Sequence, residues 1–238
     1  AVDYQLVDKL IYEDELFTLL KKETQTAEDE ELNLVSFNKY CSSKSRLKKL
    51  KFSELSETGN IAVVYAVGDI VSGEGKRTQI GSDKIAGAVR EARLDEDIKA
   101  IVLRVNSPGG SALASDVIWR EVILAKETKP VIVSMGDLAA SGGYYISCAA
   151  DKIYAQANTV TGSIGVFGVI PNLEGFLTNE IGITTDRVET NEYSTLTVTK
   201  PLSDKELLLM QESVDEVYDV FKGRVADGRE GLDVPGVD

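Results

Sequence analysis

The chain has 238 residues, enough to bury one sizeable hydrophobic core with a small appendage. Its 39 acidic and 26 basic residues give a formal net charge of −13, which argues against nucleic acid as a main partner because phosphate binding needs clustered Lys and Arg. The chain has no histidine and no CxxC pair, which argues against a zinc site, so we expect no metal and no cofactor.

The sequence contains neither a membrane span nor a signal peptide, because no apolar run reaches the roughly 18 residues that a transmembrane helix needs. The chain starts at Ala1 rather than at a methionine, and residues 231–238 have the composition of a loop. We therefore expect a fragment of a longer protein.

The first 58 residues are poor in strong structural signals. Residues 1–24 carry a broken leucine stripe that predicts a helix, and residues 24–33 are acidic and polar, which is typical of a linker. Residues 34–40 predict a short strand or docked segment. Residues 44–51 are basic and indicate a solvated face, with an acidic partner or lipid headgroups as the alternative.

Strand and helix patterns alternate from Gly59 onward. Residues 61–67 are apolar throughout and predict a strand covered on both faces. A helix opened by a Ser82 cap should follow. Further strands are predicted at residues 100–105, 130–135 and 152–155, and helices at residues 82–94 and 112–126. Residues 139–150 predict a turn that leads into a helix of small residues. This alternation predicts an α/β fold with a largely parallel sheet.

The last third of the chain predicts a helix over 170–181, a strand over 185–189 and a long final helix. Ser203 and Glu206 have the spacing of a capping box, which marks the start of that final helix. Cys148 lies among small apolar residues and is expected to be a buried thiol.

Three glycine-bearing motifs follow predicted strands or turns. They are residues 106–111 (Asn-Ser-Pro-Gly-Gly-Ser), 139–145 (Ala-Ala-Ser-Gly-Gly-Tyr-Tyr) and 161–165 (Thr-Gly-Ser-Ile-Gly). In open α/β sheets, ligands bind beyond the carboxyl ends of the strands, so these turns are candidates for a site. None is a phosphate loop, because the GxxxxGK[ST] pattern is missing.

Ser141 is a candidate nucleophile, with helix capping as the alternative role. Gly109 and Gly110 are candidates for backbone donors to an oxyanion, with an ordinary tight turn as the alternative. Ser163 is either a partner of a catalytic base or a polar turn residue. Without histidine, the base must be a lysine, a carboxylate or a free amine, and neither Lys152 nor Lys200 is clearly placed for this.

Taken together and in this order, the three motifs resemble the signatures of the signal peptide peptidase A family, also called protease IV. Its members are serine proteases of the ClpP/crotonase-like fold that use a Ser–Lys dyad. The resemblance covers residues 59–229 and implies that Ser141 is the nucleophile. It also implies that Gly109 or Gly110 and the N–H of Gly142 are oxyanion donors, and that Ser163 contacts the lysine.

The dyad lysine is where the sequence departs from short family members. In residues 191–194 (Asn-Glu-Tyr-Ser), Ser194 stands where those members carry the lysine. The chain therefore resembles the carboxyl-terminal repeat of the long, tandem-repeat members, in which the upstream repeat brings the lysine. Residues 1–24 would then be the last helix of the preceding repeat, 25–58 the connection, and 59–238 the serine-bearing domain, truncated at its C-terminal end.

The resemblance implies an enzyme that degrades remnant signal peptides at the bacterial inner membrane, with its catalytic part facing the periplasm. We expect peptide substrates, a homo-oligomer, a membrane anchor outside this chain and no activity in the isolated fragment. Two alternatives stay open. One is a crotonase-like acyl-CoA hydratase or hydrolase, because glycine turns also suit a thioester oxyanion, and the other is a non-catalytic scaffold of the same fold.

Overall fold

The computed structural model describes residues 11–27, 30, 32, 60–186, 188–191, 197–229 and 231–237. The chain divides into two compact units, Ala1–Leu55 and Ser56–Asp238. In the first unit, helix α1 (Glu13–Glu23) is preceded by Tyr12, whose N–H donates to the Glu15 carboxylate at 2.8 Å. Helix α1 therefore confirms the second half of the helix predicted over residues 1–24. Its first ten residues, the predicted strand at 34–40 and the basic run at 44–51 lie outside the described residues.

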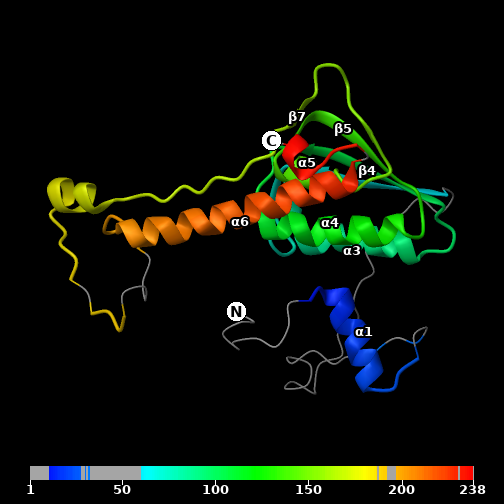
Figure 1. Ribbon diagram of the computed structural model, residues 1–238, viewed down its shortest axis with the longest axis horizontal. Helices are drawn as coiled ribbons and strands as arrows, with labels where there is room; N and C mark the ends of the chain where they lie inside the picture. The colour runs from blue at the N-terminus through cyan, green and yellow to red at the C-terminus, as the bar shows by residue number, and fades with distance from the viewer. Residues whose placement is uncertain are drawn as a thin grey trace. The chain divides into compact units, whose positions relative to one another are not determined.

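The second unit is built on a parallel sheet (Figure 1). Its strands lie in the order β1 (Ile61–Val67), β4 (Ala100–Ser107), β5 (Val131–Ala140) and β6 (Lys152–Tyr154), and β7 (Val160–Gly162) pairs with the far end of β5. Every pair in this sheet is parallel. The α/β prediction with a parallel sheet is confirmed.

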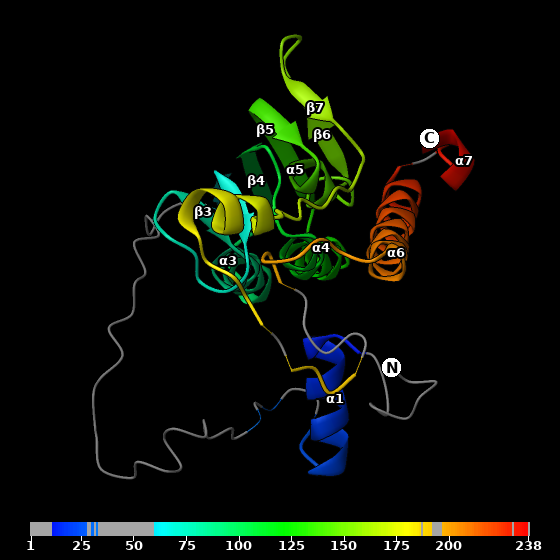
Figure 2. The same cartoon turned by 90° about the vertical axis from the view of Figure 1, so that its left-hand side faces the viewer.

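Helices α3 (Ser82–Leu94) and α4 (Ala112–Lys126) pack on one face of this sheet (Figure 2). On β1 the side chains alternate, so that Ala62, Val64 and Ala66 are buried while Val63 and Tyr65 are exposed. The prediction that both faces of β1 are covered is therefore wrong for the described chain. Because both faces of β1 carry apolar side chains, the sequence shows no alternation, although the burial alternates.

The start of α3 also differs from the prediction. Gly81 occupies the cap position, and Ser82 is the first helical residue. The Ser82 hydroxyl accepts the Gly73 N–H at 3.0 Å and donates to Asp83 at 3.0 Å. Ser82 therefore fastens the preceding turn to the helix instead of capping it.

A second, two-stranded parallel sheet pairs β2 (Asp69–Val71) with β3 (Gln79–Gly81). Each of these strands is only three residues long and lies beside glycines, so the sequence carries no clear strand pattern there. Ile70 of β2 forms a bridge to Gly110, which fixes the backbone of the first glycine motif.

Strand β5 extends five residues beyond its predicted end at Met135. Gly136 and Asp137 have the composition of a turn, but Asn106 keeps the strand in place. The Asn106 side chain accepts the Leu138 N–H at 3.0 Å, beside the register shift between Val105 and Ser107. The strand consequently runs up to Ser141.

The structure shortens two predicted helices and removes one predicted strand. After the predicted turn, helix α5 (Gly142–Tyr145) is only a single turn long and ends before residue 150, and a π-helix, η1 (Phe176–Ile181), replaces the helix predicted over 170–181. The described residues of 185–189 form no strand. Few of the apolar side chains between 166 and 190 find a buried face, so their spacing does not determine a regular element.

The final helix, α6 (Asp204–Gly228), begins as predicted with the Ser203–Glu206 capping box. Phe221 and Val225 in its C-terminal part are buried, whereas most of its N-terminal part is exposed. A short helix, α7 (Val234–Val237), follows. None of the helices in the described ranges combines the length and apolarity that a membrane crossing requires.

Candidate active site

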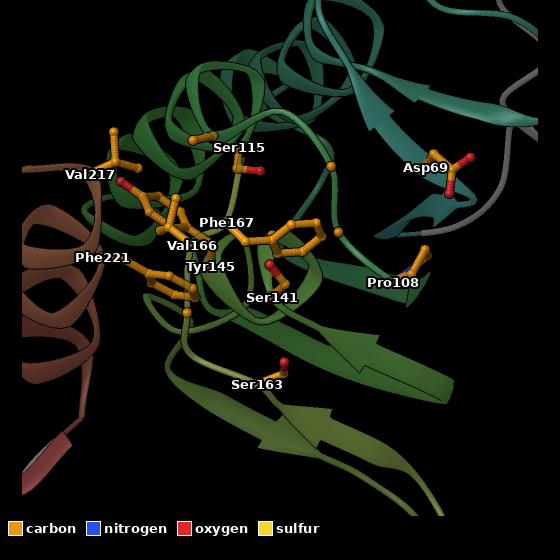
Figure 3. A pocket seen from close by; sticks show the side chains of 15 residues that line it. Asp69, Pro108, Ser115, Ser141, Tyr145, Ser163, Val166, Phe167, Val217 and Phe221 are labelled. Atoms are coloured by element: carbon orange, nitrogen blue, oxygen red, sulfur yellow. The ribbon is translucent and has the colours of Figure 1, made fainter. Parts of the chain in front are cut away.

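The three glycine motifs meet at a cavity of about 550 Å³ (Figure 3). Its lining comes from strand β2, from the segments that follow β4, β5 and β7, and from helices α4, α5 and α6. The lining residues are Asp69, Pro108, Gly109, Gly110, Ala112, Ser115, Ser141, Gly142, Tyr145, Ser163, Gly165, Val166, Phe167, Val217 and Phe221. The structure thus brings together all five residues that the sequence analysis named, although they come from three separate motifs.

Ser141 sits in a strained turn between β5 and α5. Its backbone has φ 52° and ψ −120°, a region that non-glycine residues rarely occupy and that costs on the order of 1–3 kcal/mol. The turn is held by the Ser141 N–H, which donates to the Gly162 carbonyl at 2.9 Å, and by the Ser141 carbonyl, which accepts two N–H groups at 2.9 Å. The side chain makes no capping bond, so the capping alternative fails.

Gly109 gives Ser141 the space that it needs. It has φ 105°, and a Cβ atom there would lie 2.7 Å from the Gly142 nitrogen and 2.9 Å from the Ser141 Cβ. The Gly109 N–H already donates to the Ser107 hydroxyl at 3.1 Å. Gly109 therefore allows the close approach of two backbones, while its N–H group is occupied.

Gly110 and Gly142 are better placed to donate to an oxyanion. Both line the cavity, and their N–H groups have no acceptor within the described residues. Gly110 is fixed on both sides, because Ile70 donates to the Gly109 carbonyl at 2.8 Å and accepts from Ser111 at 2.9 Å. Helix α5 is only one turn long, so these donors depend on local backbone geometry rather than on a helix dipole.

Ser163 lines the same cavity from the end of β7, with φ 49°. In Figure 3 its side chain points to the side of the cavity on which Ser141 lies. The bond between the Ser141 N–H and Gly162, the residue before Ser163, couples these two positions through the backbone.

No lysine belongs to the cavity lining formed by the described residues. Lys200 lies 3.5 Å from the Glu189 carboxylate, and Lys152 is exposed at the start of β6. Neither lysine lines the cavity. Ser194, which stands where short family members carry the dyad lysine, lies outside the described residues.

The sequence analysis did not assign Tyr145 or the final helix to the apolar side of the cavity. Tyr145 and the α6 residues Val217 and Phe221 line it, and the rings of Tyr145 and Phe221 lie 4.8 Å apart (Figure 3). No spacing rule joins Tyr145 to a residue more than seventy positions later in the chain. Asp69 was also missed, because a single carboxylate in a turn carries no signal.

Comparison with known proteins decides the family. The model of Peptidase family S49 matches residues 123–237, and the Clp protease model matches residues 70–161. Protease 4 of Salmonella typhi is 42% identical over 231 residues, which cover 96% of this chain and 36% of that protein. The chain belongs to peptidase family S49.

Further S49 relatives agree with this assignment. The chloroplastic serine protease SPPA of Arabidopsis thaliana is 36% identical over 94% of this chain and 33% of that protein. A putative signal peptide peptidase SppA of Enterococcus faecium is 35% identical over 64% of this chain and 45% of that protein. The resemblance to the signal peptide peptidase A family is confirmed, and the chain spans about a third of the length of Protease 4 and SPPA.

The Clp protease match and the parallel sheet confirm the ClpP/crotonase-like fold of this S49 chain. A solved ClpP1 mutant from Listeria monocytogenes aligns with a TM-score of 0.42 and 13% identity, covering 74% of this chain and 75% of the other.

Proposed function

We propose that this chain supplies the nucleophile of a serine endopeptidase with a Ser–Lys dyad. The observation that carries the proposal is the state of Ser141. It has a strained backbone and no capping bond, and it lines a cavity together with Gly110 and Gly142, whose N–H groups have no acceptor among the described residues. A catalytic serine needs this combination of an exposed hydroxyl and nearby oxyanion donors.

In the proposed mechanism, the Ser141 Oγ attacks a peptide carbonyl while a lysine amine takes the hydroxyl proton. The N–H groups of Gly110 and Gly142 donate to the oxyanion of the tetrahedral intermediate. The lysine then passes the proton to the leaving amine, which breaks the peptide bond and leaves an acyl-enzyme. Water, deprotonated by the same lysine, hydrolyses the acyl-enzyme and restores Ser141.

The lysine is proposed to come from a repeat that precedes this chain in the parent protein, with Ser163 orienting its amine. Two observations support an external base. No lysine lines the cavity among the described residues, and the chain spans about a third of the length of Protease 4 and SPPA. A lysine that enters a partly apolar cavity would have its pKa lowered by burial, as a general base requires.

The proposed substrates are remnant signal peptides, and their apolar side chains would pack against Val166, Phe167, Val217 and Phe221. The expectations of a periplasmic site at the inner membrane, an anchor outside this chain and a homo-oligomer belong to the same proposal. The similarity to the putative signal peptide peptidase of Enterococcus faecium supports the substrate class.

The test is cleavage of an apolar, signal-like peptide by the full-length parent protein. We expect cleavage by the wild type, none by Ser141→Ala, and a slower rate with Ser163→Ala. Tight acyl-CoA binding without peptide cleavage would instead favour the hydratase alternative. If the intact parent neither cleaves the peptide nor binds acyl-CoA, the result would favour the non-catalytic scaffold.

A further inference from the structure

The carboxylate of Asp116 joins helices α4, α5 and α6 beside the cavity. Its Oδ1 accepts the Tyr145 hydroxyl at 2.7 Å and lies 3.4 Å from the Arg224 Nε. Asp116 is on α4, Tyr145 ends α5 and Arg224 is on α6. We call these three residues the Asp116 junction.

Aromatic rings partly cover the Asp116 junction, in which the Arg224 and Asp116 side chains are 26% and 22% exposed. The Arg224 guanidinium lies 3.8 Å from the centre of the Trp119 ring, and the Tyr145 ring packs against Phe221. Tyr145, Trp119 and Phe221 are each at most 5% exposed. Burial, followed by the hydrogen bond and negative charge of Asp116, raises the pKa of Tyr145, so its hydroxyl stays protonated and donates to Asp116.

The junction is connected to the catalytic turn at one end and to the cavity wall at the other. The Tyr145 N–H donates to the Ser141 carbonyl at 2.9 Å. Arg224 lies one helical turn after Phe221, and two turns after Val217, both of which line the cavity from α6 (Figure 3). A displacement of α6 at Arg224 would therefore move the cavity wall.

The position of α6 depends on a few contacts near its C-terminal end. Leu207, Leu208 and Leu209 in its first turns are exposed, so they contribute little to docking. Beyond the junction, the Arg229 Nε donates to the Cys148 carbonyl at 2.8 Å. The Asp116 junction is a polar contact between α6 and the neighbouring helices close to the wall residue Phe221, since Arg224 is three positions away and Tyr145 touches its ring.

We propose that Asp116 is a positioning residue that holds α6 against Tyr145, so that Val217 and Phe221 form the wall that binds an apolar substrate side chain. The junction then sets selectivity for side-chain size and leaves the chemical step to Ser141. This inference rests on the proposed function, because it concerns the peptide bound at the same cavity.

The experiment compares two peptides in the full-length parent protein. They differ only at the residue whose carbonyl is attacked, which is leucine in one and alanine in the other. The variants are Asp116→Asn, Tyr145→Phe and Phe221→Ala, with Asp215→Asn as the matched control on an exposed face of α6. Circular dichroism checks that each variant is folded.

We expect the three variants to lower the leucine-to-alanine ratio of kcat/KM about 10-fold, mainly through KM, because a displaced wall loses apolar contact. The Asp215→Asn control should keep the wild-type ratio. Adding Asp116→Asn to Phe221→Ala should cause little further loss of selectivity, since both changes act on the same wall.

An unchanged ratio in Asp116→Asn, or an equal fall of kcat for both peptides, would overturn the positioning role while leaving the proposed function intact. Failure of the wild type to cleave either peptide would instead overturn the proposed function. Full additivity of Asp116→Asn and Phe221→Ala would also contradict the inference, because it would mean that the two residues act independently.

Discussion

Gly109 leaves no room for a side chain beside Ser141. Its positive φ and the 2.7 Å separation between a Cβ and the Gly142 nitrogen predict that Gly109→Ala displaces both Ser141, the proposed nucleophile, and Gly142, a proposed oxyanion donor. A displacement of about 1 Å costs on the order of 100-fold in rate. In the full-length parent, we expect Gly109→Ala to lower the rate at which a serine-directed phosphonate labels Ser141 by about this factor.

Gly168→Ala is the matched control, since a Cβ there meets nothing within 4 Å and the backbone needs no positive φ. It should label at the wild-type rate. Wild-type labelling by Gly109→Ala would show that the close contact between the two glycine motifs is unimportant.

Cys148 gives a pH-dependent contribution to stability. The side chain is fully buried, and burial raises the pKa of its thiol to about 12. In the unfolded chain the Cys148 thiol has a pKa of about 8.5. Burial of the neutral thiol therefore makes its full contribution to stability below that pH, and this contribution is lost as the pH rises towards 12. Between pH 7.5 and 10, the wild type should lose about 2 kcal/mol more free energy of unfolding than Cys148→Ala.

Urea unfolding of both chains at the two pH values checks this prediction. Burial is the largest cause of the raised pKa values of Tyr144 and Tyr145, and both chains share this burial, so most of the tyrosine effect cancels in the comparison. Identical pH slopes would contradict the burial of a neutral Cys148 thiol.

The sequence was informative about which residues meet at the site and less so about their hydrogen bonds. Ser141, Gly142 and Ser163 all line the cavity, as their motifs predicted. Which of Gly109 and Gly110 keeps a free N–H depends on the Ser107 hydroxyl, and the sequence does not reveal where that hydroxyl points.

At the scale of elements, two glycines of helix α6 differ in the space available for a side chain. A Cβ at Gly228 would lie 2.3 Å from the Cys148 carbonyl oxygen, whereas a Cβ at Gly223 meets nothing within 4 Å. Gly228→Ala should push the helix end away and cost about 1–3 kcal/mol. Gly223→Ala should stabilise the chain by up to about 1 kcal/mol, through helix propensity alone.

Urea unfolding of the two variants against the wild type measures both effects. The free energy of unfolding should fall in Gly228→Ala and rise in Gly223→Ala. Stabilisation by Gly228→Ala would mean that the end of α6 does not pack on Cys148.

Element prediction succeeded where periodicity or capping was local and failed where tertiary contacts decided. The α4 bounds and the Ser203 cap were predicted correctly, because an apolar stripe and a capping box lie within the helices themselves. The extension of β5 was not, because the Asn106 side chain supports it from the neighbouring strand. The open face of β1 was missed because its exposed residues are also apolar.

At the scale of the whole molecule, the cavity holds the proposed nucleophile Ser141 and the proposed oxyanion donors Gly110 and Gly142, but no lysine among its described lining. The S49 relatives Protease 4 and SPPA are about three times as long as this chain. The chain is therefore proposed to carry part of an active site that another segment of the parent protein completes.

The most direct test of this claim is the rate at which a serine-directed phosphonate labels Ser141 in the full-length parent and in the isolated 238-residue chain. We predict labelling of the parent, none in its Ser141→Ala variant, and labelling of the isolated chain slower by at least about 100-fold, since a general base contributes about 100- to 10,000-fold. Adding the upstream segment as a separate polypeptide should restore the rate. Labelling of the isolated chain at the rate of the parent would contradict the account and assign the base to this chain.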